Sequence, residues 1–525
     1  MKSILDESRW QGRFFMLACV TTVPFVRFVL WNDYPLLRPE VAVGVFLAAL
    51  LALVSALVTR AAWAFRAVLV AAVAVTGAAA VRDAVLAPLL QRFSWWPNVG
   101  WALLLLLCIL IPAACLLLRR VGPIVAVFSL GSLVVDISQA LVRAPRPTPI
   151  AHGAPRERPP KHVLYLVFDG HGGPEGLPTD IPECQKAKRA IEDTFERHCF
   201  RLYPYAFTNY RLTVSSLPSI INSVVPNGKA DLVRATGRFS YTLRGNSLFS
   251  DFLARGYAIR VYESTLLSFA APADRVQTRV RYNITSLGPV AFAGLPLKSR
   301  LRGLLGGYLR VDPLLWRLSS ALLRSSVVPW KRPGPLAVAG LWPRFLAQEV
   351  VGADQDTLFF AHLMTPHSPY MYRSNGGLRD VSEWYDTDGP REALKFEYAR
   401  YAEQVQALHL ELNWFFEFLK KSGVWDSLTI VVHGDHGPRM GLIDIATEPV
   451  ELPALLDSFS ALLAIKFPGV AVPSRVEMPG SVLRFVHEAL QRSGSPAGDT
   501  EVVHFGKGRQ FPLAQMWRDQ LARGL

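Results

Sequence analysis

The sequence has few charged residues and few cysteines for its length. Charged side chains make up 19% of the 525 residues, whereas hydrophobic residues make up 51%. This composition excludes a disordered or collagen-like chain and argues against a wholly soluble protein. Three of the five cysteines lie in apolar runs, which leaves Cys184 and Cys199 as the one pair that could form a disulfide in an oxidising compartment. No internal repeat is present.

The chain also lacks a concentrated basic region outside its apolar part. Its net charge is +14, and residues 1–147 hold 13 Lys/Arg against 6 Asp/Glu, a net charge of +7. The remaining 378 residues hold 43 against 36, again a net charge of +7. The positive charge is densest where the chain is most apolar, which indicates membrane orientation and no nucleic-acid partner.

Five apolar runs occupy the first 142 residues, and each is close to the length of about 20 residues that crosses a bilayer as a helix. They are Phe14–Trp31, Val41–Thr59, Ala61–Val81, Phe93–Leu118 and Val121–Val142. No small-residue cleavage site follows the first run, so we interpret it as a span and not as a removed signal peptide. Lys and Arg favour the side of the N-terminus, which predicts a cytoplasmic N-terminus and an outer location for everything after about Ala144.

The sequence therefore predicts three parts. Residues 1–143 form a five-helix transmembrane domain, and residues 144–160, rich in Pro and Arg, form an extended linker. Residues 161–525 form an outer α/β domain with a central, mostly parallel sheet. Residues 284–335 are rich in Leu, Gly and Arg, which is typical either of an amphipathic insertion lying on the membrane or of ordinary surface helices.

Unbroken apolar runs predict three strands that are buried on both faces. They are residues 162–168, 357–363 and 427–432, and long helical periodicity covers 392–421. Metal-type side chains lie at or near the ends of these strands: Asp169, then His362 and His367, then Asp435 and His436. Open α/β sheets place ligands at this edge, so we predict that these groups hold a divalent metal with mixed O/N ligands.

A hydroxyl-rich segment that opens a helix supplies candidate nucleophiles. It contains Thr213, Ser215 and Ser216 ahead of Pro218. A helix N-terminus stabilises the negative charge of a phosphoryl group, although a Ser or Thr there also serves as a simple N-cap.

These motifs resemble the membrane-anchored branch of the alkaline phosphatase/sulfatase superfamily, which contains phosphoethanolamine transferases and lipoteichoic acid synthases. The resemblance covers nearly the whole chain. It implies an alkaline-phosphatase-like catalytic domain in which Thr213, five residues before Pro218, is the nucleophile. It assigns Asp169, Thr213, Asp435 and His436 to the metal, and His362 and His367 to catalysis and substrate binding.

The resemblance also implies a function. We expect metal-dependent transfer of phosphoethanolamine or phosphoglycerol from a membrane phospholipid to an envelope glycan or lipid through a covalent threonine intermediate. The metal would be Zn or Mn, and the enzyme would be a multi-pass protein of the bacterial inner membrane with a periplasmic catalytic domain. A membrane-anchored sulfatase or phosphodiesterase that uses the same site is the alternative, and a non-enzymatic scaffold is a third reading.

Three departures from the family pattern bear on the site. The stretch Pro438–Thr447 lacks the further histidine of the phosphoethanolamine enzymes, so a second metal would need His433 or His171. We also assign His433 to substrate binding. The outer domain has at most one disulfide, whereas those enzymes usually have several. Ile220 replaces the arginine of true sulfatases, which argues against formylglycine chemistry but leaves Ser215 and Ser216 open as nucleophiles.

Overall fold

The structure is a computed structural model that divides into two compact units. Residues 1–148 and 287–331 form the first unit, and residues 149–286 and 332–525 form the second. The structure describes residues 10–31, 36–58, 161–226, 232–237, 240–269, 275–282, 342–379, 391–440, 450–505 and 509–523. It also describes the single positions Leu297, Arg300, Leu301, Leu304, Leu305, Tyr308, Pro335, Val338 and Glu383.

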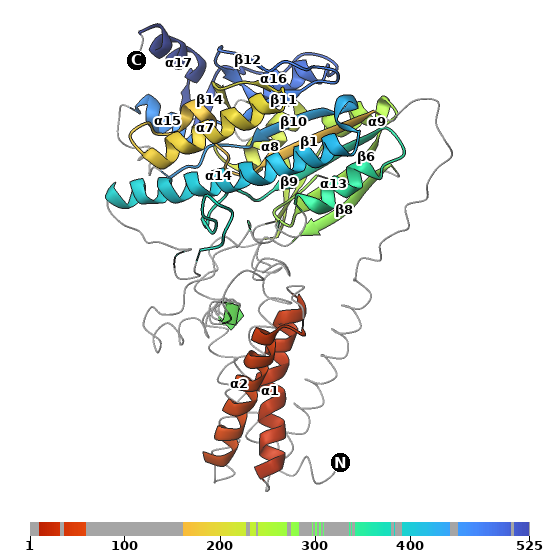
Figure 1. Cartoon of the computed structure of the whole chain (residues 1–525), viewed down its shortest axis with the longest axis vertical. Helices are drawn as coiled ribbons and strands as arrows, with labels where there is room; N and C mark the ends of the chain where they lie inside the picture. Colours follow the sequence, from red (N-terminus) through yellow and green to blue (C-terminus); the bar gives the residue numbers. More distant parts are fainter. Residues whose placement is uncertain are drawn as a thin grey trace. The chain divides into compact units, whose positions relative to one another are not determined.

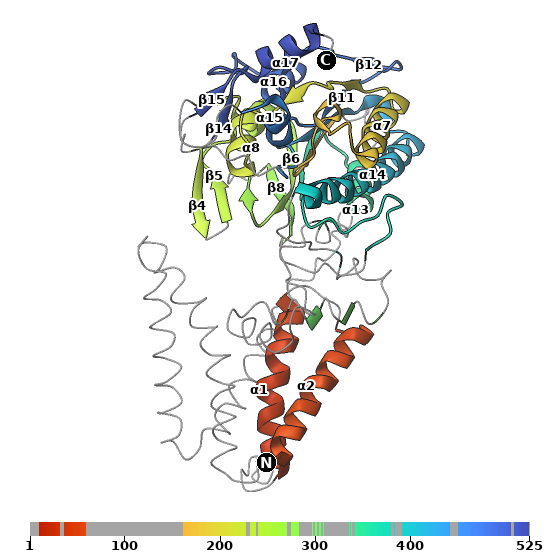
Figure 2. The ribbon, with the colours of Figure 1, turned by 90° about the vertical axis from the view of Figure 1, so that its left-hand side faces the viewer.

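The first unit contains two long apolar helices that lie side by side, α1 (Trp10–Trp31) and α2 (Pro39–Val58) (Figures 1 and 2). Buried residues of both helices form a common core, and the Thr21 hydroxyl donates a hydrogen bond to the Ala48 carbonyl at 3.2 Å. Both helices are long and apolar enough to cross a membrane. They correspond to the first two predicted spans, while the other three predicted spans and the linker at 144–160 lie outside the described residues.

The insertion 287–331 belongs to the first unit, although it follows part of the α/β domain in the sequence. Arg300 Nη1 lies 3.4 Å from the buried carboxylate of Glu40 at the start of α2. The Tyr308 ring packs on Phe25 and Phe28 of α1. These contacts join the insertion to α1 and α2, and both interpretations of the segment, an amphipathic insertion lying on the membrane or ordinary surface helices, stay predictions.

An eight-stranded, mostly parallel sheet forms the centre of the second unit, as predicted. Its strands, in spatial order, are β12 (Ser474–Arg475), β2 (Arg201–Leu202), β11 (Leu463–Lys466), β10 (Thr429–Gly434), β1 (His162–Phe168), β9 (Thr357–Leu363), β6 (Ala258–Ser264) and β8 (Val276–Tyr282). The pairings of β10 with β11 and of β11 with β2 are antiparallel, and the others are parallel. The central strands β10, β1 and β9 correspond to the three predicted buried strands.

Helices cover both faces of this sheet, which explains why its central strands are continuously apolar. Leu164 and Leu166 of β1 pack with α7 (Pro182–Arg197), α13 (Arg344–Val351) and α14 (Arg391–Lys421) on one face. Val163 and Val167 pack with α8 (Thr213–Asn222), α9 (Ser247–Ala254) and α16 (Val482–Ala489) on the other. Figure 2 shows these two helical layers on opposite sides of the strands.

Smaller elements complete the unit. They are the sheet β13 (Gly480–Ser481) with β3 (Ala206–Phe207), the sheet β4 (Val233–Gly237), β5 (Ser240–Leu243) and β7 (Leu267–Ser268), the hairpin β14 (Val503–Phe505) with β15 (Arg509–Phe511), the helices α15 (Leu452–Phe459) and α17 (Leu513–Ala522), and the short 3-10 helices η2 (Pro174–Gly176) and η4 (Trp425–Ser427). Cys184 and Cys199 are both free, so the disulfide considered from the sequence is not formed.

Candidate active site

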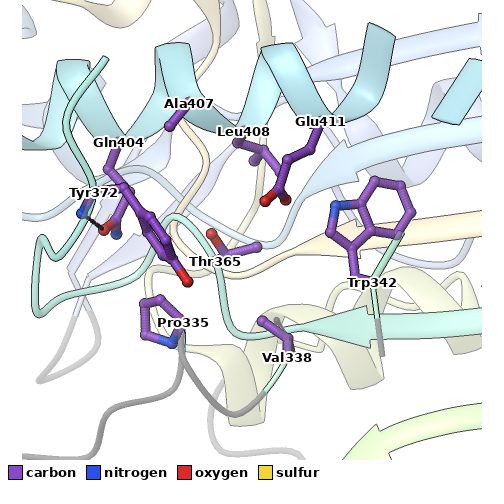
Figure 3. A pocket seen from close by; sticks show the side chains of 9 residues that line it. All are labelled: Pro335, Val338, Trp342, Thr365, Tyr372, Gln404, Ala407, Leu408 and Glu411. Carbon is purple, nitrogen blue, oxygen red and sulfur yellow. Dashed lines mark hydrogen bonds between the residues drawn. The ribbon is translucent and has the colours of Figure 1, made fainter. Parts of the chain in front are cut away.

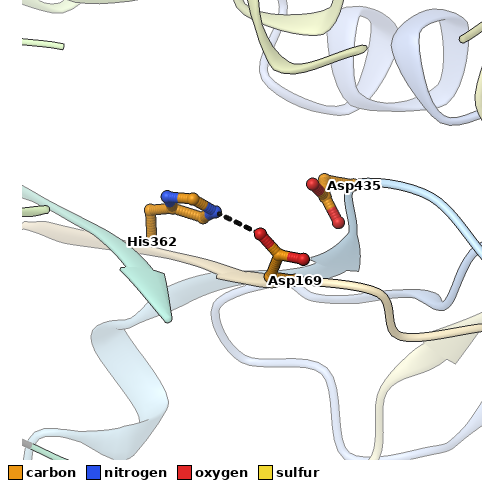
Figure 4. Close-up of side chains that lie close together, drawn as sticks. All are labelled: Asp169, His362 and Asp435. Carbon is orange, nitrogen blue, oxygen red and sulfur yellow. Dashed lines mark ion pairs between the residues drawn. The ribbon is translucent and has the colours of Figure 1, made fainter. Parts of the chain in front are cut away.

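The parallel register of three central strands brings the predicted metal ligands together. Phe168 of β1 pairs with Leu363 of β9 on one side and with Gly434 of β10 on the other, so the three strands end at the same level. Asp169 follows β1 directly and Asp435 follows β10 directly, whereas His362 is the penultimate residue of β9. All three side chains therefore meet at the carboxyl edge of the sheet (Figure 4).

Asp169, His362 and Asp435 form a compact, buried group. One ligand atom from each residue lies within 4.8 Å of the others, and all three residues are fully buried. Asp169 Oδ2 is 3.5 Å from His362 Nε2, and the Gly170 amide donates a hydrogen bond of 2.8 Å to Asp435 Oδ1. Gly170 adopts a φ of +72°, a conformation that side chains other than glycine rarely adopt, and this allows the tight turn after Asp169.

Thr213 is the first residue of α8, and its hydroxyl faces this group. Its Oγ1 lies 3.3 Å from Asp169 Oδ2 and 3.2 Å from His436 Nε2. The hydroxyl carries one proton, and both neighbours can accept it. Ser216, one turn into α8, is buried, and its hydroxyl has no hydrogen-bond partner among the described residues. The contacts of Thr213 with the carboxylate and the imidazole distinguish it from the neighbouring serines.

His436 is held in a single tautomer that turns a lone pair toward the site. Its Nδ1 lies 2.8 Å from the carbonyl of Gly437, and because a carbonyl only accepts, Nδ1 carries the proton. Its Nε2 is therefore an acceptor, 3.3 Å from Asp435 Oδ2 and 3.8 Å from Asp169 Oδ1. Burial, followed by the positive charge of Arg439, lowers the pKa of His436 to about 3, which keeps the imidazole neutral.

His367 approaches the same carboxylate from the loop after β9. Its Nε2 lies 3.8 Å from Asp169 Oδ1, and its side chain is 28% exposed, unlike the buried His362. The loop is anchored by Gln404 of α14, whose amide Nε2 donates to the carbonyls of Pro366 and His367 at 2.9 and 3.1 Å. Of the two histidines predicted to act on the substrate, His367 is therefore the one that a substrate can reach from solvent.

The carboxylates of Asp169 and Asp435 lie close together in a buried site, where a bound cation would stabilise their charged forms. Burial opposes ionisation of Asp169, but the charges of His367 and the hydrogen bond of His362 outweigh it and hold its pKa well below the usual range. Burial, together with the negative charge of Asp169, raises the pKa of Asp435. Asp169 Oδ1 and Asp435 Oδ2 are buried without a hydrogen-bond donor among the described residues.

These residues fit a divalent metal. Two buried carboxylates and imidazole nitrogens are the mixed O/N ligand set that Zn²⁺ and Mn²⁺ accept, and a cation would compensate the charge that raises the pKa of Asp435. The predicted ligands Asp169 and Asp435 lie in the compact group, and Thr213 and His436 lie directly beside it. His362, predicted to act on the substrate, lies within the compact group, and we therefore count it among the candidate ligands.

The remaining predicted histidines make their hydrogen bonds elsewhere. His433 Nδ1 donates to the Gly434 carbonyl at 2.8 Å, and its Nε2 accepts from Tyr165 at 3.1 Å. His171 Nδ1 donates to the Gly172 carbonyl at 2.9 Å, and its Nε2 faces His409 Nε2 at 3.2 Å. With both ring nitrogens engaged, neither histidine presents a free lone pair for a second metal, and the structure gives the substrate role predicted for His433 no supporting contact among the described residues.

Two arginines that the sequence reasoning missed contribute positive charge near the site. Arg439 follows the Asp435–His436 segment, adopts a φ of +58°, and donates its backbone amide to the Asp457 carbonyl. Arg211 lies two residues before Thr213, and burial, followed by the charge of Arg439, lowers its pKa. Paired guanidinium groups of this kind suit an anionic phosphoryl or sulfuryl substrate. In the sequence, the one signal for these arginines was their position, because Arg211 lies close to Thr213 and Arg439 lies close to His436.

Comparison with known proteins gives distant structural matches. No family model matches the chain, and no curated protein matches it. Solved structures similar to it include the phosphonate monoester hydrolase of Agrobacterium radiobacter, with 13% identity, coverage of 66% of this chain and 82% of the other, and a TM-score of 0.37. The lipoteichoic acid synthase of Listeria monocytogenes matches with 14% identity, 67% and 76% coverage, and a TM-score of 0.35. A protein of the alkaline phosphatase superfamily from Vibrio parahaemolyticus matches with 12% identity, 67% and 74% coverage, and a TM-score of 0.36.

Proposed function

We propose that this protein is a membrane-anchored, metal-dependent phosphotransferase. It moves the phospho-headgroup of a membrane phospholipid, phosphoethanolamine or phosphoglycerol, to a glycan or lipid of the cell envelope. The observation that carries the proposal is the position of the Thr213 hydroxyl between Asp169 Oδ2 and His436 Nε2, at 3.3 and 3.2 Å, at the N-terminus of α8. This geometry activates a nucleophile and does not merely cap a helix.

In the first half-reaction, Thr213 Oγ1 attacks the phosphorus of the donor phosphodiester. A bond forms between Oγ1 and phosphorus, the bond from phosphorus to the diacylglycerol oxygen breaks, and the Thr213 proton passes to His436 Nε2. His367, the reachable histidine, protonates the leaving oxygen. A divalent metal held by Asp169, His362 and Asp435 would supply Lewis acidity, which would favour loss of the Thr213 proton and neutralise charge on the phosphoryl group.

In the second half-reaction, an acceptor hydroxyl or phosphate attacks phospho-Thr213. A bond forms between the acceptor oxygen and phosphorus, and the bond from phosphorus to Thr213 Oγ1 breaks. The acceptor proton passes to His367, which the first step left unprotonated, and His436 returns its proton to Thr213 Oγ1. Arg211 and Arg439 compensate the charge of the phosphoryl oxygens in both steps. The apolar helices α1 and α2 support the anchoring, because each is long enough to cross a membrane. An enzyme anchored in this way lies at the same membrane interface as its lipid donor.

The test uses the full-length protein in lipid nanodiscs that contain phosphatidylethanolamine or phosphatidylglycerol labelled in the headgroup. Release of diacylglycerol with the label bound to protein, followed by its loss on addition of an envelope extract, supports transfer. Release of free phospho-headgroup at the same rate with and without acceptor would show a hydrolase instead. Ser215→Ala is the matched control, because this serine lies on the same helical turn.

A further inference from the structure

One side of α14 reaches all three loops that carry the groups of the candidate active site. These loops follow β10, β1 and β9, which are neighbours in the central sheet. Tyr398, Tyr401 and Gln404 are spaced three residues apart on α14, so they lie on the same side of the helix. Each of them makes hydrogen bonds to a different loop or to the residue that holds it, and none of them takes part in the reaction described above.

Tyr401 holds the turn that follows Asp169. Its hydroxyl donates a hydrogen bond of 3.1 Å to the Gly170 carbonyl and accepts one of 2.8 Å from the Gly172 amide. Both glycines are buried, so loss of the hydroxyl costs more than loss of an exposed hydrogen bond. The Gly170 amide in turn donates to Asp435 Oδ1 at 2.8 Å. The turn that Tyr401 holds therefore carries one buried carboxylate and contacts the other.

Gln404 holds the loop after β9. Its amide nitrogen donates to the carbonyls of Pro366 and His367 at 2.9 and 3.1 Å. Its Oε1 accepts from the amides of Met371 and Tyr372 at 2.6 and 3.2 Å, and Figure 3 shows the second of these bonds. One buried side chain thus joins the backbone at His367 to the backbone four and five residues later.

Tyr398 acts on the segment after β10 through Asp457. Its hydroxyl donates a hydrogen bond to Asp457 Oδ1, which also accepts one of 3.1 Å from the Met440 amide. The Asp457 carbonyl accepts from the Arg439 amide at 3.0 Å. Asp457 is buried near the end of α15, where it links α14 to the segment that continues from His436.

The order of these contacts along α14 is the order of the strands in the sheet. Tyr398 serves the segment after β10, Tyr401 the turn after β1 and Gln404 the loop after β9. Residues three apart are separated by about 4.5 Å along a helix, and neighbouring strands lie about 4.8 Å apart. One helix can therefore meet three successive loops with one side chain for each.

We propose that Tyr398, Tyr401 and Gln404 are positioning residues that set the three loops relative to one another. Tyr401 keeps Asp169 and Asp435 at a distance at which they can share a metal, whereas Gln404 places His367. The two roles are separable, because His367 is not among the candidate ligands. The inference rests on the proposed function only for the step that uses His367, since metal binding needs no turnover.

Metal binding tests the role of Tyr401 without any catalytic step. Zn²⁺ or Mn²⁺ is titrated into the metal-depleted full-length protein in lipid nanodiscs, in competition with a chromophoric chelator. Tyr401→Phe keeps the ring and removes only the hydroxyl, and we expect at least about tenfold weaker binding. Tyr262→Phe is the matched control, because this buried tyrosine loses a hydrogen bond of 3.1 Å to Glu349, outside the site. The control should bind the metal within about twofold of the wild type.

Hydrogen exchange shows which loop each side chain holds. In the metal-free protein, Tyr401→Phe should speed amide exchange in residues 169–172 and not in residues 365–372. Gln404→Met, which keeps the length of the side chain, should do the reverse. The proposal is overturned if Tyr401→Phe binds the metal as tightly as the wild type, if Tyr262→Phe weakens binding equally, if the wild-type protein binds neither Zn²⁺ nor Mn²⁺, or if each variant speeds exchange in both segments.

Turnover separates the failure of this inference from the failure of the proposed function. Gln404→Met should lower kcat by about tenfold or more while it keeps the metal affinity of the wild type, because it displaces His367 and no metal ligand. Metal affinity and kcat equal to those of the wild type in both variants would overturn the positioning role and leave phosphotransfer standing. Turnover of neither lipid by the wild type, with metal binding weakened by Tyr401→Phe, would overturn the proposed function and leave the positioning role standing.

Discussion

The Oγ1 atom of Thr213 lies 3.2 Å from Nε2 of His436, although 223 residues separate the two in the chain. The contact exists because α8 begins where β10 ends, and because the Gly437 carbonyl fixes the proton of His436 on Nδ1. A neutral imidazole with its free lone pair beside a hydroxyl is the arrangement that a nucleophile needs.

Replacing His436 with alanine should lower kcat by about 100-fold or more, because it removes both the acceptor for the Thr213 proton and a neighbour of the carboxylate group. The measurement is steady-state turnover of headgroup-labelled phospholipid. His504→Ala is the control, since His504 stacks on Tyr210 and makes no contact with Asp169, Thr213 or Asp435. A decrease in kcat of less than about threefold would contradict the assignment.

Replacing Asp435 with asparagine should weaken metal binding by at least about tenfold, because the site loses one of its two buried carboxylates. The same change should raise thermal stability in the metal-free protein, since it removes the repulsion from Asp169 that raises the pKa of Asp435. Metal content by mass spectrometry and melting with and without chelator check the two effects. Asp426→Asn, outside the site, should change neither, and a stoichiometric metal in Asp435→Asn would contradict the ligand assignment.

Replacing Arg439 with alanine should raise KM by about tenfold with a smaller effect on kcat, because a positive charge that attracts the phosphoryl group is lost. It should also raise the pKa of His436, whose depression depends partly on Arg439. The pH profile of kcat/KM is the readout, because loss of a merely structural arginine would leave its acidic limb in place. Arg475→Ala, in an exposed ion-pair cluster, serves as the control.

Glu411 should make stability depend on pH. Its pKa is about 7 in the folded protein against a usual value of 4.5, so stability present below pH 4.5 is lost as the pH rises through 7. The difference of about 2.5 pH units corresponds to at most about 3.5 kcal/mol, from about 1.4 kcal/mol for each unit. Subtracting the unfolding curve of Glu411→Gln from that of the wild type isolates this group. A flat difference between pH 5 and pH 9 would be inconsistent with a raised pKa of the partly buried Glu411 carboxylate.

The Arg300–Glu40 pair should couple the insertion 287–331 to α2 within the first unit. Glu40→Gln and Arg300→Gln should each destabilise the detergent-solubilised protein, because each leaves one buried or half-buried charge without its partner at 3.4 Å. The double variant should be more stable than the two single effects predict, by about 1 kcal/mol in a double-mutant cycle. Additive effects would show that the two side chains do not interact.

The sequence was informative about the sheet and its ligands for a physical reason. A strand that is buried on both faces is apolar at every position, so residues 357–363 could be delimited from composition alone, and the polar residue after such a strand must lie at the edge of the sheet. Asp169 and Asp435 were found in this way. The helix now described as α14 was predictable because its apolar periodicity extends over many turns.

Other features depended on packing that no local pattern records. His362 was assigned to the substrate because the family that the chain resembles has a substrate-side pair of histidines five residues apart, as His362 and His367 are. The register of β9 against β1 places His362 beside Asp169. The same limit applies to the small cavity that Glu411 and Trp342 both line, since 69 residues separate the two in the chain. The sequence did not indicate a role for the positive charge of Arg439, because only the fold shows that it lies near His436 and Arg211.

The central claim, that Thr213 carries the phospho-group covalently, is tested most directly by intact mass spectrometry of the full-length protein. The protein is incubated with phosphatidylethanolamine or phosphatidylglycerol without acceptor, quenched in acid, and mapped by peptide sequencing. We predict a single phospho-headgroup adduct on Thr213 in the wild type and in Ser215→Ala and Ser216→Ala, and no adduct or turnover in Thr213→Ala. Turnover of the lipid by Thr213→Ala at the wild-type rate, or an adduct on either serine, would contradict the account.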